Sequence, residues 1–496
     1  MTPTLLWFDY ETFGRSPAWD RPAQFAGVRT DLELRPIEAP VTLHCRVPDD
    51  YLPDPGACRI TGIAPQDVAD GLPEHRFVRR ALDELGRPGT VSVGYNSVAF
   101  DDEFTRFAAH RTFEDPYAHE WRDGASRWDL LDVVRLTRAL RPDGIRWPNA
   151  EDGRPTVRLE ALAAANGIEQ ARAHDALSDV EATIGVARLV RARQPKLYDW
   201  CFERRTKAAA SALLDVRARP ALLLAAGTVP AERHHLAAIC PIAPHPTDRS
   251  GIVALDLATD PDALVGLDVE TLRRGAFAPA AELGGTPRLG LRTVRANRCP
   301  VLAPFGTLRP ADAERLGLDR AELLARRERL LAHLGDPDFE RRLTGAATRE
   351  WPAPDPDADV DGTLYSHGFL SRGDRARLAA LLDGPPERLA RAPGGFDDAR
   401  LDEMLWRYKA RNLPASLDGA ERARWRAERV ARLGAADEVP WRTFAGFDAA
   451  LAAAADDPGW AGDEGRRLIG ALSAWRDALA GDEASGTPAR RDDAGA

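Results

Sequence analysis

Apolar strand-like runs alternate with helical patterns over residues 1–190 of the chain. Three segments rich in β-branched and aromatic side chains predict strands, at LLWFDYETF, around VTLHCRV and at TVSVGYN. Apolar residues three and four positions apart predict helices at FVRRALDEL, WDLLDVVRLTRAL, RLEALAAAN and DALSDVEATIGVARLVRAR. Strands that alternate with helices of this length predict an α/β fold around a mixed sheet.

The pattern changes after Pro195, which a helix does not easily pass. From about residue 200 to 345, short β-like runs such as GIVALDL stand among prolines, and the helical pattern ADAERLGLDRAELLARRERLLAHL follows them. The stretch 351–362 contains three prolines and four aspartates, which is typical of a linker. Beyond it the periodicity is helical, and the last residues lack the apolar content that a packed structure needs.

These changes divide the chain of 496 residues into three domains, a linker and a tail. Three domains agree with the typical size of about 150 residues per domain. The predicted parts are an α/β domain at 1–195, a β-rich domain at 196–350, a linker at 351–362, a helical domain at 363–480 and a disordered tail at 481–496.

Composition narrows the class of protein and the kind of metal site. Hydrophobic residues make up 44% and charged residues 29%, a balance typical of soluble domains. No apolar run reaches the roughly 18 residues that span a bilayer, and the first residues carry carboxylates where a signal peptide is apolar, so we expect a cytoplasmic protein with no membrane partner. The five cysteines form no CxxC pair, so any metal is expected to be bound by oxygen.

The net charge of −10 argues at first against a nucleic-acid partner, since such partners are bound through Lys and Arg. The charge is unevenly distributed, however, and residues 201–350 carry a positive balance while the parts before and after them are negative. Only three of the 67 basic residues are lysines, a bias that a GC-rich coding habit explains most simply. The charge therefore does not exclude a nucleic-acid partner.

Three short elements carry the candidate chemistry. Asp9 and Glu11 lie two apart on the first predicted strand, so both carboxylates project from one face. Carboxylates on such an apolar strand are costly unless they are paired or bind a metal, and this spacing suits two cations that share ligands. Asp101 and Asp102 open a predicted helix after TVSVGYN; only one of the two can face the same point, and we choose Asp101.

The third element is AHDALSDVEAT, in which His174 and Asp179 lie five apart at the start of a long predicted helix. Five residues turn an ideal helix by about 140°, so the two side chains converge only if His174 precedes the regular helix. Each element alone has a structural explanation: a solvent-facing strand, a helix-capping aspartate or a structural histidine. Their occurrence in the order D-x-E, D and H-x4-D makes coincidence an unlikely explanation.

This pattern resembles the DEDDh exonuclease superfamily, whose fold is similar to that of ribonuclease H. Longer blocks resemble the bacterial exodeoxyribonuclease I family. They are FDYETFG, PAWDRPAQFAGVRTD, DYLPDPGACRITGI, GYNSVAFDDEFTR, SRWDLLDVVRLTRALRPDGIRWP, NGIEQARAHDALSDVEAT and RYKARNLPASLD. The resemblance covers nearly the whole chain, weakens over 205–350 and ends about twenty residues before the C-terminus.

The resemblance implies a ribonuclease H-like exonuclease domain, an SH3-like barrel and an all-α C-terminal domain that together form a clamp around DNA. It implies a monomeric 3′→5′ exonuclease that degrades single-stranded DNA to nucleoside 5′-monophosphates in DNA repair and recombination. His174 would be the general base. Two Mg²⁺ ions, with Mn²⁺ as an alternative, would be held by four carboxylates: Asp9, Glu11, Asp101 and Asp179.

Contacts with partners follow from the same resemblance. Aromatic and arginine side chains are interleaved in DPYAHEWRDGASRWDLLDVVR, a mixture suited to stacking bases and neutralising phosphates, although an aromatic core with solvated arginines is an equal alternative. Arg141 is assigned to a basic patch for the acidic C-terminal tail of single-strand DNA-binding protein. The expected contacts with the DNA strand are Glu11, Arg106, Tyr117, Trp121, Arg135 and Arg158.

Two other functions remain open. An exoribonuclease or a proofreading exonuclease would use the same five residues, but such proteins are usually short single-domain chains, whereas some 300 residues follow the first domain here. A non-catalytic single-stranded DNA-binding protein could retain the fold, but the intact set of five residues argues against it.

Overall fold

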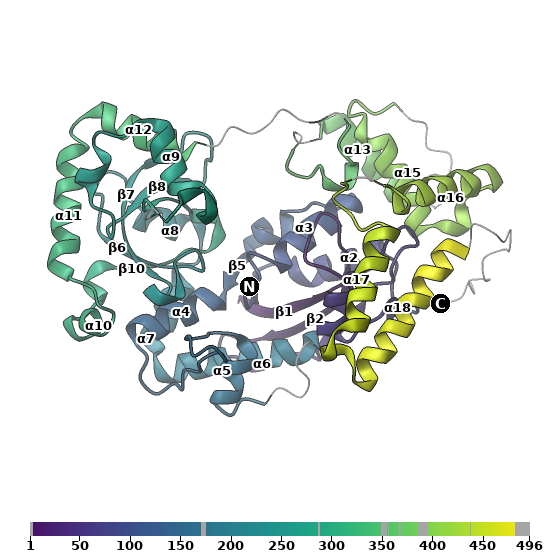
Figure 1. Ribbon diagram of the computed structural model, residues 1–496, viewed down its shortest axis with the longest axis horizontal. Coiled ribbons are helices and arrows are strands. Elements are labelled where there is room, and N and C mark those ends of the chain that lie inside the picture. The colour runs from purple at the N-terminus through teal and green to yellow at the C-terminus, as the bar shows by residue number, and fades with distance from the viewer. Residues whose placement is uncertain are drawn as a thin grey trace.

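The computed structural model describes residues 3–169, 175–285, 288–348, 355, 357–366, 368, 370–384, 395–436 and 438–481. His174 lies outside these residues, as do most of the stretch 351–356 and the predicted tail beyond Gly481. Figure 1 shows the β-rich domain at one end of the molecule and the C-terminal helices at the other, both against the N-terminal α/β domain. None of the helices in the described parts is long and apolar enough to cross a bilayer.

The N-terminal domain is built on a five-stranded mixed sheet in the order β3-β2-β1-β4-β5. β1 pairs antiparallel with β2 and parallel with β4, so it lies at the centre of the sheet. Its even-numbered apolar residues pack under α2 and α3, and its odd-numbered ones pack under α4 and α6. The strands are β1 (Thr4–Thr12), β2 (Pro22–Thr30), β3 (Val41–His44), β4 (Thr90–Gly94) and β5 (Ser126–Asp129).

Two of these strands differ from the sequence expectation. β2 was not predicted; it is buried along its whole length, so it shows no alternation of apolar and polar residues. The segment WDLL was predicted to begin a helix, but the chain stays extended through Asp129, whose carboxylate accepts a hydrogen bond from Leu131 N and caps α4. The helices of this domain are α1 (Pro55–Thr61), α2 (Glu74–Leu85), α3 (Asp101–Arg111), α4 (Leu130–Leu140), α5 (Leu159–Ala165), α6 (Ala176–Arg193) and α7 (Pro195–Glu203).

The β-rich domain contains an antiparallel sheet in the order β10-β6-β7-β8-β9, which confirms the predicted class of this domain. Its strands are β6 (Leu222–Ala225), β7 (Leu236–Pro244), β8 (Gly251–Asp256), β9 (Leu291–Arg295) and β10 (Val301–Pro304). Its helices are α8 (Lys207–Leu213), α9 (Val269–Phe277), α10 (Pro310–Arg315), α11 (Arg320–His333) and α12 (Pro337–Ala347).

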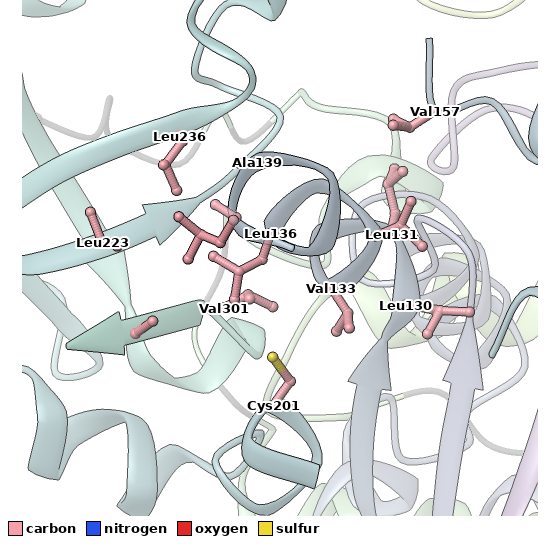
Figure 2. Close-up of a cluster of buried hydrophobic side chains, with 14 of the residues drawn as sticks. Leu130, Leu131, Val133, Leu136, Ala139, Val157, Cys201, Leu223, Leu236 and Val301 are labelled. Atoms are coloured by element: carbon pink, nitrogen blue, oxygen red, sulfur yellow. The ribbon is translucent and has the colours of Figure 1, made fainter. Parts of the chain in front are cut away.

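The first two domains share one hydrophobic core. Figure 2 shows Leu136 of α4 among Leu223, Leu236 and Val301 of the β-rich sheet, with Cys201 of α7 beside them. Tyr198 and Phe202 of α7 also meet the ring of Trp128 edge to face, so the packing of the first domain continues past residue 195. Because buried apolar surface is shared, the two domains are expected to keep a fixed relative position.

The C-terminal domain is helical among the described residues, as predicted. Phe447 of α17 and Leu468 and Leu472 of α18 form a buried cluster with Phe13 and Tyr51 of the first domain. The helices are α13 (Arg372–Leu382), α15 (Arg400–Asn412), α16 (Gly419–Leu433), α17 (Phe444–Asp456) and α18 (Asp463–Gly481).

The end of the stretch 351–362, which we expected to be a linker, is part of a domain interface. Asp361 is 3% exposed and accepts hydrogen bonds from Arg21 at 3.1 Å and from Arg411 at 2.8 Å. Arg411 also donates to Asp50 at 2.7 Å. Burial alone would raise the pKa of Asp361, but Arg411 and Arg21 hold it well below the usual value. Asp361 is therefore not solvated as a linker residue would be, because arginines of the first and C-terminal domains pair with it.

Candidate active site

The central strand β1 presents two carboxylates on one face. Leu5 and Trp7 pack into the core beneath α4 and α6, and Asp9 and Glu11 continue the same odd-numbered face toward the end of the strand. Glu11 is only 7% exposed. The two-residue period of the strand thus brings both carboxylates to one point, as predicted from the sequence.

A third carboxylate reaches the same point from α6. Asp179 lies in the first turn of this helix, and the side chain of Gln24 on β2 holds the start of the helix. The Gln24 amide donates to the Asp175 carboxylate at 3.2 Å and accepts from Ala176 N at 3.1 Å. One oxygen each of Asp9, Glu11 and Asp179 consequently lies within 4.8 Å of the others.

Asp101 and Asp102 point to different neighbours at the start of α3. The Asp101 carboxylate accepts a hydrogen bond from Tyr10 N at 3.0 Å, which ties it to β1 between the two strand carboxylates. The Asp102 carboxylate instead accepts from Arg127 at 2.5 Å. Asp101 is thus the member of the pair that is oriented toward the carboxylate cluster.

The cluster holds its carboxyl groups against strong mutual repulsion. Burial raises the pKa of Asp9 well above its usual value, and the charges of Asp101 and Glu11 raise it further. Burial and the charge of Asp179 raise the pKa of Glu11 to about 8. A cation bound among these oxygens would relieve the repulsion, and hard oxygen ligands suit a divalent ion such as Mg²⁺.

A cavity of about 410 Å³ opens beside Asp9 and Asp179. Its other walls come from the turn after β4, from α4, from the segment that leads into α5, and from the β-rich domain. The lining residues beyond the two aspartates are Tyr95, Asn96, Leu131, Arg135, Pro155, Thr156, Val157, Arg158, Leu159, Glu160 and His235.

Several of these lining residues were not predicted from the sequence. Asn96 has a left-handed backbone (φ 75°), and its N–H donates to the buried Asp129 carboxylate at 2.9 Å. His235 comes from the β-rich domain, more than fifty residues beyond the last predicted catalytic residue. Glu160 adds a carboxylate to the wall. Only the unusual backbone of Asn96 has a weak sequence signal, since asparagine tolerates this conformation better than most residues.

The predicted strand contacts occupy two kinds of environment. Arg135 and Arg158 line the cavity, and the Arg158 side chain is 75% exposed. Trp121 is 64% exposed, an unusual surface position for a large aromatic ring. Glu11 belongs to the carboxylate cluster, and the buried Arg106 guanidinium lies 5.4 Å from the Tyr117 ring centre.

Arg141 lies at the end of α4, against the β-rich domain. It donates to the carboxylate of Asp312 at 3.0 Å and to the carbonyl of Thr307 at 3.0 Å. Arg309 and Arg315 pair with the same Asp312. Three guanidinium groups around one carboxylate leave a local excess of positive charge.

A ribonuclease H-like sheet with a partly buried carboxylate cluster at the end of its central strand defines the class of a nuclease. The model of the exonuclease family matches residues 6–187, that of the Exonuclease I SH3-like domain matches 205–344, and that of the Exonuclease I C-terminal domain matches 358–479. The chain belongs to the exodeoxyribonuclease I family and is an exonuclease.

Individual relatives agree over nearly the whole length. Exodeoxyribonuclease I of Escherichia coli is 44% identical over 85% of this chain and 88% of its own, and that of Haemophilus influenzae is 40% identical over 86% and 90%. The solved exonuclease I of Methylocaldum szegediense is 44% identical with a TM-score of 0.88, covering 96% of this chain and 99% of its own.

Two of the solved structures of the Escherichia coli relative contain single-stranded DNA. One is a complex with a dA16 oligonucleotide (TM-score 0.87), and the other is a zinc-bound form of a complex with single-stranded DNA (TM-score 0.88). Both are 40% identical to this chain, cover 96% of it and match the whole of the relative.

Proposed function

We propose that this enzyme removes nucleoside 5′-monophosphates from the 3′ end of single-stranded DNA in DNA repair and recombination, with two Mg²⁺ ions bound by Asp9, Glu11, Asp101 and Asp179. The observation that carries the proposal is the cluster of Asp9, Glu11 and Asp179 oxygens within 4.8 Å of one another, beside a cavity of about 410 Å³. Mn²⁺ has the same preference for oxygen ligands and is the expected substitute.

The residues of the site have separate tasks. When bound, the two ions would lower the pKa of the attacking water and stabilise the leaving 3′ oxygen. The carboxylates of β1 and α6 would hold the ions, and the hydrogen bond from Tyr10 N keeps Asp101 oriented toward the same point. His174 is assigned as the general base, because the ordinary pKa of a histidine side chain lies near neutral pH.

Other residues of the cavity wall suit a terminal nucleotide. Arg135 and Arg158 supply positive charge for a phosphate, and Tyr95 supplies an aromatic ring beside them. The oligonucleotide complexes of the Escherichia coli relative support a single strand as the substrate. Glu11, Arg106, Tyr117 and Trp121 remain proposed contacts along the strand.

A second partner is proposed for the surface around Arg141. The shared pairing of Arg141, Arg309 and Arg315 with Asp312 supports binding of an acidic peptide, for which we propose the C-terminal tail of single-strand DNA-binding protein. The chain is proposed to act as a monomer.

One assay tests the proposed function against its alternatives. The full-length enzyme is incubated with 5′-labelled single-stranded DNA, duplex DNA and RNA, with Mg²⁺ and with excess chelator. We expect a ladder that shortens from the 3′ end of the single-stranded DNA only, and only with Mg²⁺. Equal digestion of RNA would favour an exoribonuclease, and binding of DNA without digestion would favour a non-catalytic protein.

The contribution of the cavity arginines is expected to appear in the salt dependence of DNA binding. Arg158→Ala should reduce the slope of log affinity against log salt by about 0.7, the contribution of one neutralised phosphate on a single strand. The control is Arg154→Ala, because Arg154 is similarly exposed (67%) and also pairs with a nearby carboxylate, but does not line the cavity. Equal slopes for Arg158→Ala and the wild type, measured by titration at several salt concentrations, would contradict a phosphate contact at Arg158.

A further inference from the structure

One carboxylate on α3 joins all three domains. The Glu103 Oε1 atom accepts hydrogen bonds from Arg106 of the same helix at 2.7 Å and from Arg298 of the β-rich domain at 2.8 Å. Its Oε2 atom accepts from the hydroxyl of Tyr365 at 2.5 Å. Tyr365 lies in the segment matched by the C-terminal family model, so the two outer domains meet through a single side chain.

The charges make this junction sensitive to the carboxylate. Two guanidinium groups bond the same Glu103 oxygen, so Arg106 and Arg298 lie close together and share its negative charge, while Arg106 also pairs with Glu120 at 2.7 Å. The side chains of Glu103 and Arg106 are 13% and 6% exposed, whereas that of Arg298 is 42% exposed, so water screens the Arg298 contact more than the Arg106 contact. A neutral side chain at this position would remove the charge that Arg106 and Arg298 share and loosen the contact between α3 and the β-rich domain.

Tyr365 makes two further contacts with α3. The Tyr365 ring meets Phe107 of α3 edge to face at 5.5 Å, and Arg106 Nη1 donates to the Tyr365 hydroxyl at 3.3 Å. From the β-rich side, the carbonyl of Asn297 accepts from Arg127, which pairs with Asp102. The first turn of α3 therefore carries Asp101 toward the active site and Asp102 and Glu103 toward the outer domains.

We propose that Glu103 is a latch between the two outer domains, a positioning residue that keeps the strand enclosed and sets how many nucleotides are removed before release. The proposal rests on the proposed function, since it requires that a DNA strand leads from the carboxylate cluster past the outer domains. The hydrophobic cores keep each domain attached when the latch is broken, so the change is a local opening. Chemistry at the 3′ end persists, and the strand escapes sooner.

The latch makes a prediction opposite to that of a simple charge effect. If Glu103 only repelled the phosphates, Glu103→Gln would bind DNA more tightly and digest further. If it is a latch, the same variant releases its strand after fewer nucleotides. We expect the digested length per binding event to fall about three- to tenfold, the change in dissociation rate that loss of one or two net hydrogen bonds produces.

The experiment uses the full-length chain and a long 5′-labelled single strand, with excess unlabelled strand as a trap after digestion starts. Single-turnover release of the first nucleotide from a short oligonucleotide is measured in parallel. Glu103→Gln, Arg298→Ala and Tyr365→Phe should each shorten the digested length while the single-turnover rate stays within about twofold of the wild type. Arg295→Ala is the matched control, because Arg295 lies on the same edge of the β-rich domain but pairs with Asp248.

The variants also test whether the three groups act as one unit. Adding Tyr365→Phe to Glu103→Gln should shorten the digested length no further, because the hydroxyl has already lost its acceptor. Tyr365→Phe removes one hydroxyl from a half-exposed side chain, so it tests the latch even if the other variants unfold.

Three results would overturn the latch: an unchanged or longer digested length in Glu103→Gln, an equal fall in its single-turnover rate, or additive shortening in the double variant. An inactive wild-type enzyme on both substrates would instead overturn the proposed function, and the latch with it.

Discussion

Alanine at Asp9 or Asp179 is expected to abolish nuclease activity while the enzyme stays folded. Each residue contributes an oxygen to the cluster that is proposed to bind two Mg²⁺ ions, so loss of either carboxylate would weaken metal binding. Activity on 5′-labelled single-stranded DNA is the measurement, and Asp70→Ala is the control, since Asp70 is an exposed carboxylate away from the cluster. Near-wild-type turnover in either variant would refute the metal assignment.

The same variants are expected to stabilise the metal-free enzyme. Glu11 has a pKa of about 8 in the folded chain, above its ordinary value of 4.5, because of burial and the charge of Asp179. Between pH 4.5 and 8 the folded state therefore holds more protons than the unfolded state, and stability falls as pH rises through this window. Asp179→Ala removes one repelling charge, so its melting temperature at pH 8 without metal should exceed that of the wild type.

Mg²⁺ should reverse this order of melting temperatures, so that the wild type becomes more stable than the variants. The ion binds the deprotonated carboxylates and stabilises the folded state of the wild type, whereas Asp9→Ala and Asp179→Ala should gain little. Thermal unfolding at pH 6 and pH 8, with Mg²⁺ and with chelator, measures both effects. A wild-type melting temperature that rises from pH 6 to pH 8 without metal would contradict the repulsion inferred for the cluster.

Alanine at His174 is expected to lower the single-turnover rate by about 10²- to 10⁴-fold, the range for loss of a general base. The carboxylates remain, so DNA and metal should bind with nearly wild-type affinity. His174 lies outside the described residues, and its role stays a prediction from the H-x4-D spacing and the family resemblance. Single-turnover kinetics measures the loss of rate, and equilibrium binding to the same oligonucleotide measures whether DNA affinity is retained.

His333→Ala is the control for this substitution, because His333 pairs with Asp262 in the β-rich domain, away from the cavity. Added imidazole should restore part of the rate of His174→Ala by accepting the proton from solution. If the variant instead loses DNA binding and keeps its rate at saturating substrate, His174 is a binding residue and not the base.

The order of domains and the type of most elements were predictable because they depend on local patterns. Helical spacing of apolar residues predicted α2, α5 and α6, and the apolar run around Asp9 predicted β1. The strand β2 was missed, since a strand buried along its whole length has no alternation to recognise.

The candidate site was predictable in part for the same reason. The two-residue period of a strand brings Asp9 and Glu11 to one face whatever the rest of the chain does. The choice of Asp101 over Asp102 had no basis in the local pattern, because neighbouring aspartates at a helix start look alike in sequence. Their difference is tertiary: Tyr10 N holds the first and Arg127 holds the second.

The sequence by itself determined which residues could bind metal, because carboxylates at fixed spacings along a strand and a helix are a local property. Only the tertiary structure decided what surrounds them. His235 enters the cavity wall from a second domain, Asp361 pairs with arginines of the first and third domains, and Glu103 joins all three. These contacts link residues tens to hundreds of positions apart, and their energy comes from burial and charge pairing that exist only after the domains have packed.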